Sequence, residues 1–257
     1  FSLDGVVGTN LRQEKNIVNG ISSSNQFVRG LLNHQNFQTS EGFSFNTTEN
    51  TIGAYATATL GFKNFLYVGF QGRNDWTSTL EKENRSIFYP SGSVAFVPTD
   101  AFASLQGSTV LNYLKLRVGY GTSAGYPDPY QTRNILSTDP RAFVANSGTV
   151  LSTNSVDNRL GNQNLTPERH TELEVGVEAR FLQNRIGVDF SWYDKRSKDL
   201  IIDLQLDPAT GFTNTTVNAA ELSNKGIELG INLVPIKGEF TWDMTLNFTR
   251  NRNIVQT

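Results

Sequence analysis

Hydrophobic and polar residues alternate strictly along several segments of the chain, which places one set of side chains on each face of an extended strand. The clearest case is residues 240–250, where polar residues separate five large apolar ones: Phe240, Trp242, Met244, Leu246 and Phe248. A helix would instead group its apolar residues at intervals of three and four positions. The pattern therefore predicts a β-strand with one apolar and one polar face.

Eight further segments show the same alternation and predict an all-β chain of about nine strands. They are residues 1–13, 51–62, 65–75, 91–97, 114–120, 171–180, 185–194 and 226–234. A strand of ~10 residues that rises ~3.3 Å per residue and tilts by ~40° spans about 25 Å. That height equals the apolar band of a transmembrane β-barrel.

The predicted connections alternate between long and short. Long ones cover residues 14–50, 76–90, 122–170 and 195–225, and short ones cover 63–64, 181–184 and 235–239. Residues 98–112 are intermediate, and we expect a wide turn there with one turn of helix. Short periplasmic turns and long extracellular loops are typical of bacterial outer-membrane barrels. The sequence thus predicts an antiparallel transmembrane β-barrel.

The strand number bears on whether this barrel is complete. Bacterial single-chain barrels have an even number of strands, and an open sheet edge would leave backbone groups unpaired in lipid. We therefore expect residues 1–257 to be part of a larger barrel domain. Both ends of the sequence look cut, since it begins at Phe1 and stops at Thr257 directly after a strand-like run.

Composition excludes several other classes of protein. No stretch approaches ~18 consecutive apolar residues, which rules out helical membrane spans but not barrel strands. The formal net charge is -2 with scattered charges, so the sequence has no electrostatic footprint for nucleic acid. Cysteine is absent, so the chain can form neither a disulfide nor a thiolate metal site.

Several segments in collinear order resemble the SusC/RagA family of TonB-dependent transporters. The similar segments are YPSGSVAF at 89–96, LKLRVGYGTSAG at 114–125, LGNQNLTPER at 160–169, RIGVDFSWYDKRSKDLI at 185–201 and NKGIELGIN at 224–232. Arg73, Asn74 and Asp75 also resemble a family strand end, although Trp76 replaces the usual glycine, and Pro167 stands where tryptophan is usual. Each motif is short, and their specificity lies in the shared order.

This resemblance implies a barrel of about 22 strands, of which the chain would be a central to late part without the N-terminal plug. It also implies import of nutrient oligomers, glycans or peptides, across the outer membrane of Bacteroidota. The implied partners are a SusD-like surface lipoprotein and TonB with ExbB and ExbD. Specificity would lie in loops 122–170 and 195–225, because loops vary more than strands.

Candidate site residues are few. Trp76, Tyr126 and Tyr130 are predicted loop aromatics that could stack on a sugar or a peptide side chain. The only imidazoles, His34 and His170, lie outside any recognisable nucleophile motif. A carboxylate trio, Glu172, Glu174 and Glu178, shares one strand face, which fits a water-filled lumen better than a metal or acid/base site.

We accordingly expect no catalytic residue, no bound metal and no cofactor. Two alternatives to the importer stay open. A passive porin or adhesin barrel would lack the plug and the TonB-contacting segment. A secreted carbohydrate-binding β-sandwich would purify without detergent. An enzyme ranks below both, and a cluster of serine, histidine and carboxylate within hydrogen-bonding reach would revive it.

Overall fold

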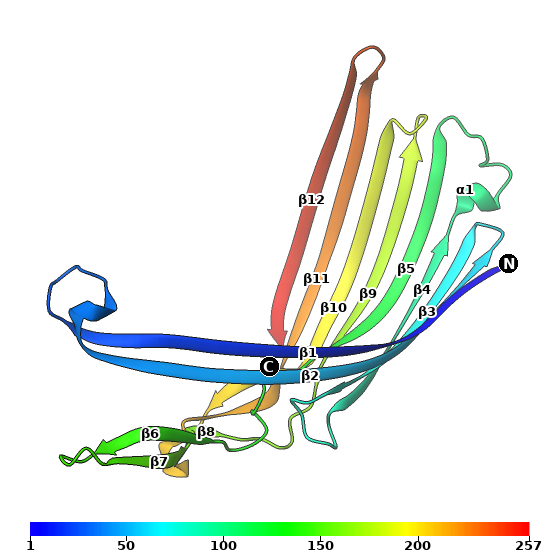
Figure 1. The fold of residues 1–257 in the computed structure, drawn as a ribbon. Coiled ribbons are helices and arrows are strands. Elements are labelled where there is room, and N and C mark those ends of the chain that lie inside the picture. The colour runs from blue at the N-terminus through cyan, green and yellow to red at the C-terminus, as the bar shows by residue number, and fades with distance from the viewer. Residues whose placement is uncertain (257) are drawn as a thin grey trace.

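The computed structural model describes residues 1–256 and shows one curled antiparallel sheet (Figure 1). The sheet has ten strands, nine of them in the order β1-β2-β3-β4-β5-β9-β10-β11-β12. Their bounds are β1 Ser2–Gln26, β2 Phe37–Phe62, β3 Leu66–Thr77, β4 Ser86–Phe96, β5 Leu111–Gly125, β9 Glu168–Phe181, β10 Ile186–Gln205, β11 Asn214–Lys237 and β12 Thr241–Gln256. The nine-strand prediction and the fold class are confirmed.

The remaining elements lie in the connections. A hairpin of β6 (Leu136–Val144) and β7 (Val150–Val156) forms a separate small sheet, and β8 (Arg159–Leu160) pairs with β11. Helix α1 (Pro98–Ala101) is the single helical turn expected between 98 and 112, and two short 3-10 turns cover His34–Asn36 and Pro208–Thr210. Among residues 1–256, no helix is long and apolar enough to cross a membrane.

Turns and loops are segregated as expected, but four long loops are shorter than predicted. The turns near 63–64, 182–185 and 238–240 gather at one end together with the connection 97–110 that carries α1, and the other four connections gather at the opposite end (Figure 1). The prediction of a loop over 14–50 is wrong, because only residues 27–36 connect β1 to β2. Strand β10 likewise continues to Gln205 and β11 starts at Asn214, so residues 206–213 connect them.

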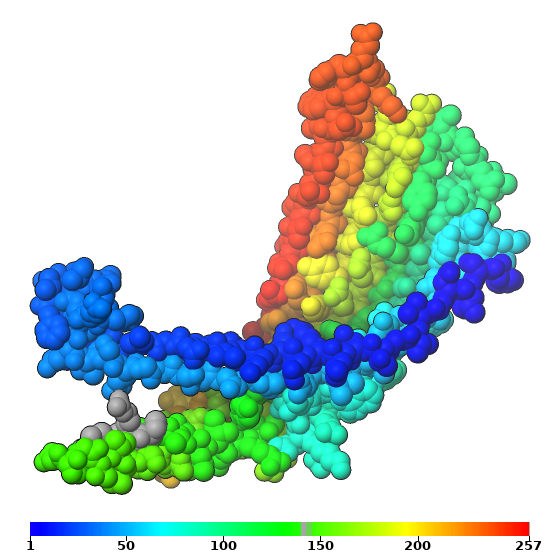
Figure 2. All heavy atoms as spheres, viewed as in Figure 1, coloured from blue at the N-terminus to red at the C-terminus, as the bar shows by residue number. Residues whose placement is uncertain are grey.

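The same error affects the other two long connections. Residues 78–85 join β3 to β4 where 76–90 was expected, and 126–167 join β5 to β9 where 122–170 was expected. Beyond the membrane both faces of a strand meet water, so the apolar alternation stops there. The backbone hydrogen bonds between the strands nevertheless continue. Ser24 still pairs with Thr39 near the tip of the β1–β2 hairpin, which projects clear of the sheet (Figure 2).

Pairing partners show how the alternation builds two faces. Val177, Phe190, Leu229 and Phe248 lie opposite one another on β9 to β12, and so do Gly176, Ser191 and Glu228 on the other face. Large apolar residues on the first face stay exposed, including Val118, Val175, Phe190, Leu246 and Phe248. One face is therefore suited to lipid and the other to water.

Aromatic residues gather at the end of the sheet that carries the short turns. Phe62, Phe65, Phe96 and Phe102 form a chain of edge-to-face contacts with ring centroids 5.3 to 6.1 Å apart. Such a girdle is typical of the membrane interface of a barrel. Tyr193 does not share this face, because it pairs with Glu174 on the polar side.

Candidate functional site: the polar wall

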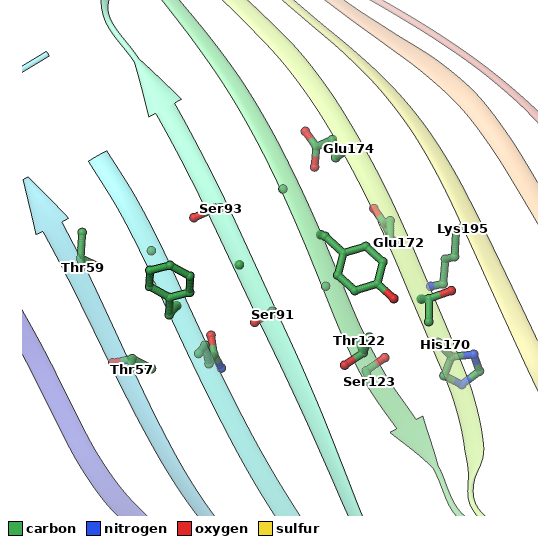
Figure 3. Close-up of a pocket in the computed structure, with 18 of the residues that line it drawn as sticks. Thr57, Thr59, Ser91, Ser93, Thr122, Ser123, His170, Glu172, Glu174 and Lys195 are labelled. Atoms are coloured by element: carbon green, nitrogen blue, oxygen red, sulfur yellow. The ribbon is translucent and has the colours of Figure 1, made fainter. Parts of the chain in front are cut away.

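A hollow of about 510 Å³ crosses six strands on the polar face of the sheet (Figure 3). We call its lining the polar wall. The hydroxyl and amide groups come from β2 to β5 and the ionisable ones from β9 and β10: Thr57, Thr59, Gln71, Ser91, Ser93, Ser123, His170, Glu172, Glu174 and Lys195. A hollow that spans six strands of a curled sheet lies on its concave side, which is the lumen.

The alternation explains why this wall is both polar and hollow. Thr57 pairs with Gln71, and Thr59 pairs with Gly69, so every second residue of β2 and β3 faces inward. Gly119 faces Glu174 across β5 and β9. Glycine and small hydroxyl residues leave room for a ligand, and their hydroxyl groups both donate and accept hydrogen bonds.

A charged network borders the hollow. The Arg117 guanidinium reaches Asp189 at 2.7 Å and the Ser191 hydroxyl at 2.6 Å, and Ser191 donates to Glu174 at 3.0 Å. The Arg117 side chain crosses Gly176, where a Cβ would clash with it. The network therefore joins β5, β9 and β10 and holds carboxylates at the lumen surface, as the sequence predicted for the glutamates.

A second cluster surrounds Asp75 near the extracellular end of β3. Asp75 is 5% exposed, and its carboxylate pairs with Arg73 at 2.8 Å and accepts a hydrogen bond from the Tyr89 hydroxyl. Tyr126, just beyond β5, reaches the same carboxylate at 3.5 Å. Burial, and then the negative charge of Asp75, raise the pKa of Tyr126, so its phenol stays protonated.

Polar contacts tie the connection 126–167 to β10 and to the connection between β3 and β4. Arg133 binds Glu81 through two hydrogen bonds of 2.6 and 2.7 Å, and these hold the pKa of Glu81 down at about 2. Arg159 binds Asp203 at 2.6 Å and thereby lowers the pKa of that carboxyl group. The Asn84 amide donates to the Leu165 carbonyl, beside a fully buried side chain.

One cluster has the arrangement of serine, histidine and carboxylate that would support the enzyme alternative. Ser197 Oγ lies 2.8 Å from His170 Nδ1, and His170 Nε2 lies 3.5 Å from Glu168 Oε2. Ser197 is only 6% exposed, and Glu168 accepts the amide hydrogen of Ile201 at 2.7 Å. These contacts surround a β-bulge between Ser197 and Leu200, so the cluster joins β9 to β10 where the strand register shifts.

The structure places the three predicted aromatics at three separate sites. Tyr126 belongs to the Asp75 cluster, and Tyr130 lines a smaller cavity of about 250 Å³ with Glu81 and Arg133. Trp76 is not in a loop, because β3 extends to Thr77. It is 38% exposed and lies on the face opposite to that of Asp75. Contact with ligand stays a prediction for all three.

Sequence reasoning did not identify most of the polar wall. It recognised Arg73 and Asp75 as part of a motif but gave them no role, and it passed over the serines and threonines of β2 to β4. These serines and threonines occupy the polar positions of the alternating segments. Once a barrel was inferred, those positions could have been predicted to face the lumen. Their convergence across six strands could not, since it depends on strand pairing.

The geometry defines a class of protein: the chain forms part of the wall of an outer-membrane β-barrel, with a polar lumen face and an apolar lipid face. Comparison with known proteins then shows the family. The sequence profile described as "TonB dependent receptor-like, beta-barrel" matches residues 1–256, so the chain belongs to this family. Its members are outer-membrane receptors and transporters rather than enzymes.

Individual relatives agree with this assignment. TonB-dependent receptor P26 of Formosa agariphila is 30% identical over 195 residues, 75% of this chain and 19% of the relative. TonB-dependent receptor SusC of Bacteroides thetaiotaomicron is 29% identical over 214 residues, 80% of this chain and 21% of the relative. The RagAB peptide transporter superposes with a TM-score of 0.82 at 21% identity, covering 98% of this chain and 28% of that one. The chain thus spans a quarter or less of the curated relatives' length.

Proposed function

We propose that this chain is the wall of an energised importer that carries nutrient oligomers, glycans or peptides, across the outer membrane. The observation that supports this most strongly is the hollow of about 510 Å³ on the lumen face, in a chain of the TonB-dependent family. Hydroxyl groups, carboxylates and a lysine can exchange hydrogen bonds with sugar hydroxyls or peptide amides during passage. A shallow, open wall suits transient contacts with many such groups.

The proposed partners are a SusD-like surface lipoprotein above the barrel and TonB, with ExbB and ExbD, below it. Support comes from the relative named SusC and from the RagAB complex, which is described as a peptide transporter. In this proposal residues 1–257 are part of the barrel domain, and the plug and other strands belong to a longer protein. The protein binds and gates its cargo and has no catalytic step.

Tyr126 and Tyr130 are the aromatic residues that we place nearest to the cargo. Both lie in connection 126–167, and Tyr130 is 54% exposed. An exposed phenol ring can stack on an apolar face of a sugar or a side chain and also offers a hydroxyl group. Trp76 remains a weaker candidate because its indole lies on the outward face.

Uptake by intact cells tests the proposal. A strain without the full-length gene should lose growth on one oligomer class, and labelled glycans or peptides identify which one. Removing TonB should stop uptake through the protein, whereas a passive porin would continue to conduct. Unchanged growth on every oligomer, together with loss of surface attachment, would instead support an adhesin.

A further inference from the structure

Positive side chains gather on the outward face of β10 to β12, directly after the apolar residues that face lipid. We call Arg196, Lys225, Arg250 and Arg252 the cationic belt. Strand pairing shows that they share the outward face: Lys225 lies opposite both Asp194 and Arg252, and Arg250 lies opposite Ile227. All four are exposed or more than half exposed.

The belt lies at the extracellular edge of the apolar band. The unbroken run of outward apolar residues ends at Leu173 on β9, Trp192 on β10, Ile227 on β11 and Phe248 on β12. By strand pairing, the boundary on β12 lies two outward residues nearer to the periplasmic end than the boundary on β9. A level membrane surface that crosses tilted strands produces such a shift. On β11 and β12 the next outward residue is a cation, Lys225 or Arg250.

Asp194 orients part of the belt without cancelling its charge. Its carboxylate, 13% exposed, binds Lys225 at 3.1 Å and Arg196 at 3.3 Å. One carboxylate among four cations leaves three positive charges over a few strand spacings. The outward face of β2 and β3 differs at this level, since Asn50, Ile52 and Trp76 carry no charge.

We propose that the cationic belt binds the phosphate groups of an anionic lipid in the outer leaflet of the outer membrane. Guanidinium groups match phosphate oxygens with paired hydrogen bonds, and each basic residue near an anionic membrane surface strengthens binding roughly fivefold. The apolar residues just below the belt would contact the acyl chains of the same lipid. The belt would thereby fix the depth and orientation of this side of the barrel.

The test uses the full-length protein, purified in detergent and freed of lipid, and titrated with nanodiscs containing lipid A or dephosphorylated lipid A. The variant Lys225→Gln, Arg250→Gln, Arg252→Gln should bind lipid A discs on the order of 100-fold more weakly. A matched variant, Lys15→Gln, Arg29→Gln, Lys82→Gln, removes three exposed extracellular cations away from the belt and should bind like the wild type.

Folding of each variant is checked by its heat-dependent mobility on gels. The belt variant should also bind the two kinds of disc equally well. Equal affinity of wild type and belt variant for lipid A, or wild-type affinity that does not depend on phosphate, would overturn the proposal. An equal loss in the matched variant would do so too, because it would show a net-charge effect.

Discussion

Arg117 and Asp189, 72 positions apart in the sequence, form an ion pair of 2.7 Å across the strand that separates them. The pair exists because Gly176 of β9 has no side chain where the Arg117 stem passes. A glycine in a strand interior ordinarily weakens the strand, and here it permits a contact between β5 and β10. Strand order alone would not predict that contact.

Gly176→Val should disrupt this network. The new side chain displaces Arg117 from Asp189 and Ser191, and both ends of the pair are partly exposed, so the loss is about 1 kcal/mol of folding free energy. Thermal unfolding of the full-length protein, followed by gel mobility, measures it. Gly119→Val, where nothing lies within 4 Å of the added Cβ, is the control. Equal losses of stability in both variants would argue against a stabilising contact of Arg117 across Gly176.

The tie between Glu81 and Arg133 should be lost only in acid. The folded pKa of Glu81, about 2, lies below its ordinary value of 4.5, so the tie's stabilisation is complete above pH 4.5 and disappears as pH falls toward 2. Spin labels on cysteines introduced at Lys82 and Ser137 should report a narrow distance distribution at pH 7 that broadens between pH 4.5 and 2.

Two substitutions sharpen that measurement. Glu81→Gln should broaden the distribution already at pH 7, because the charge-assisted pair with Arg133 is gone. Glu83→Gln removes a neighbouring charge without touching the two hydrogen bonds between Arg133 and Glu81, and it should behave like the wild type. A distribution that stays narrow in Glu81→Gln at every pH would mean that other contacts hold this connection.

Tyr130→Ala should weaken cargo binding two- to tenfold, the range expected for one lost aromatic contact of about 0.5 to 1.5 kcal/mol. Trp76→Ala should leave affinity unchanged, since its indole points away from the lumen side. Calorimetry of the full-length protein with its transported oligomer separates the two. A larger effect at Trp76 than at Tyr130 would show that cargo or partner reaches the outward face.

Ser197→Ala should affect stability and not hydrolysis. Losing the hydrogen bond between Ser197 and His170 at the bulge should cost about 1 kcal/mol. Hydrolysis of p-nitrophenyl esters by the full-length protein should be at background level and identical in Ser197→Ala and His170→Gln. Serine-dependent turnover would identify the cluster of Ser197, His170 and Glu168 as catalytic and would contradict a purely structural role.

The sequence predicted the membrane part of the fold well because lipid on one face imposes strict alternation. Residues 171–180 and 226–234 were recognisable for that reason. The outer halves of β1, β2, β10 and β11 were missed because water meets both faces there, as at Ser24 and Thr39, and no periodic signal remains.

The candidate site was predictable only in its chemical character. The glutamates of β9 were expected to face a lumen, and two of them, Glu172 and Glu174, line the hollow. The position of Tyr126 beside Asp75 depends on how the chain returns after β5, which no local pattern encodes. The outward direction of Trp76 followed from its parity with Asp75, but only after the end of β3 was known.

Strands β5 and β9 are hydrogen-bonded neighbours from Leu111 to Gly125, although the 42 residues numbered 126–167 separate them in the sequence. Their backbone pairing is made by the two strands themselves and includes no residue of the segment between them. This segment can be exchanged, lengthened or replaced as a cassette while the barrel beneath keeps its shape. Under the proposed function, recombination at this one place would change which cargo is bound without altering the strands of the barrel.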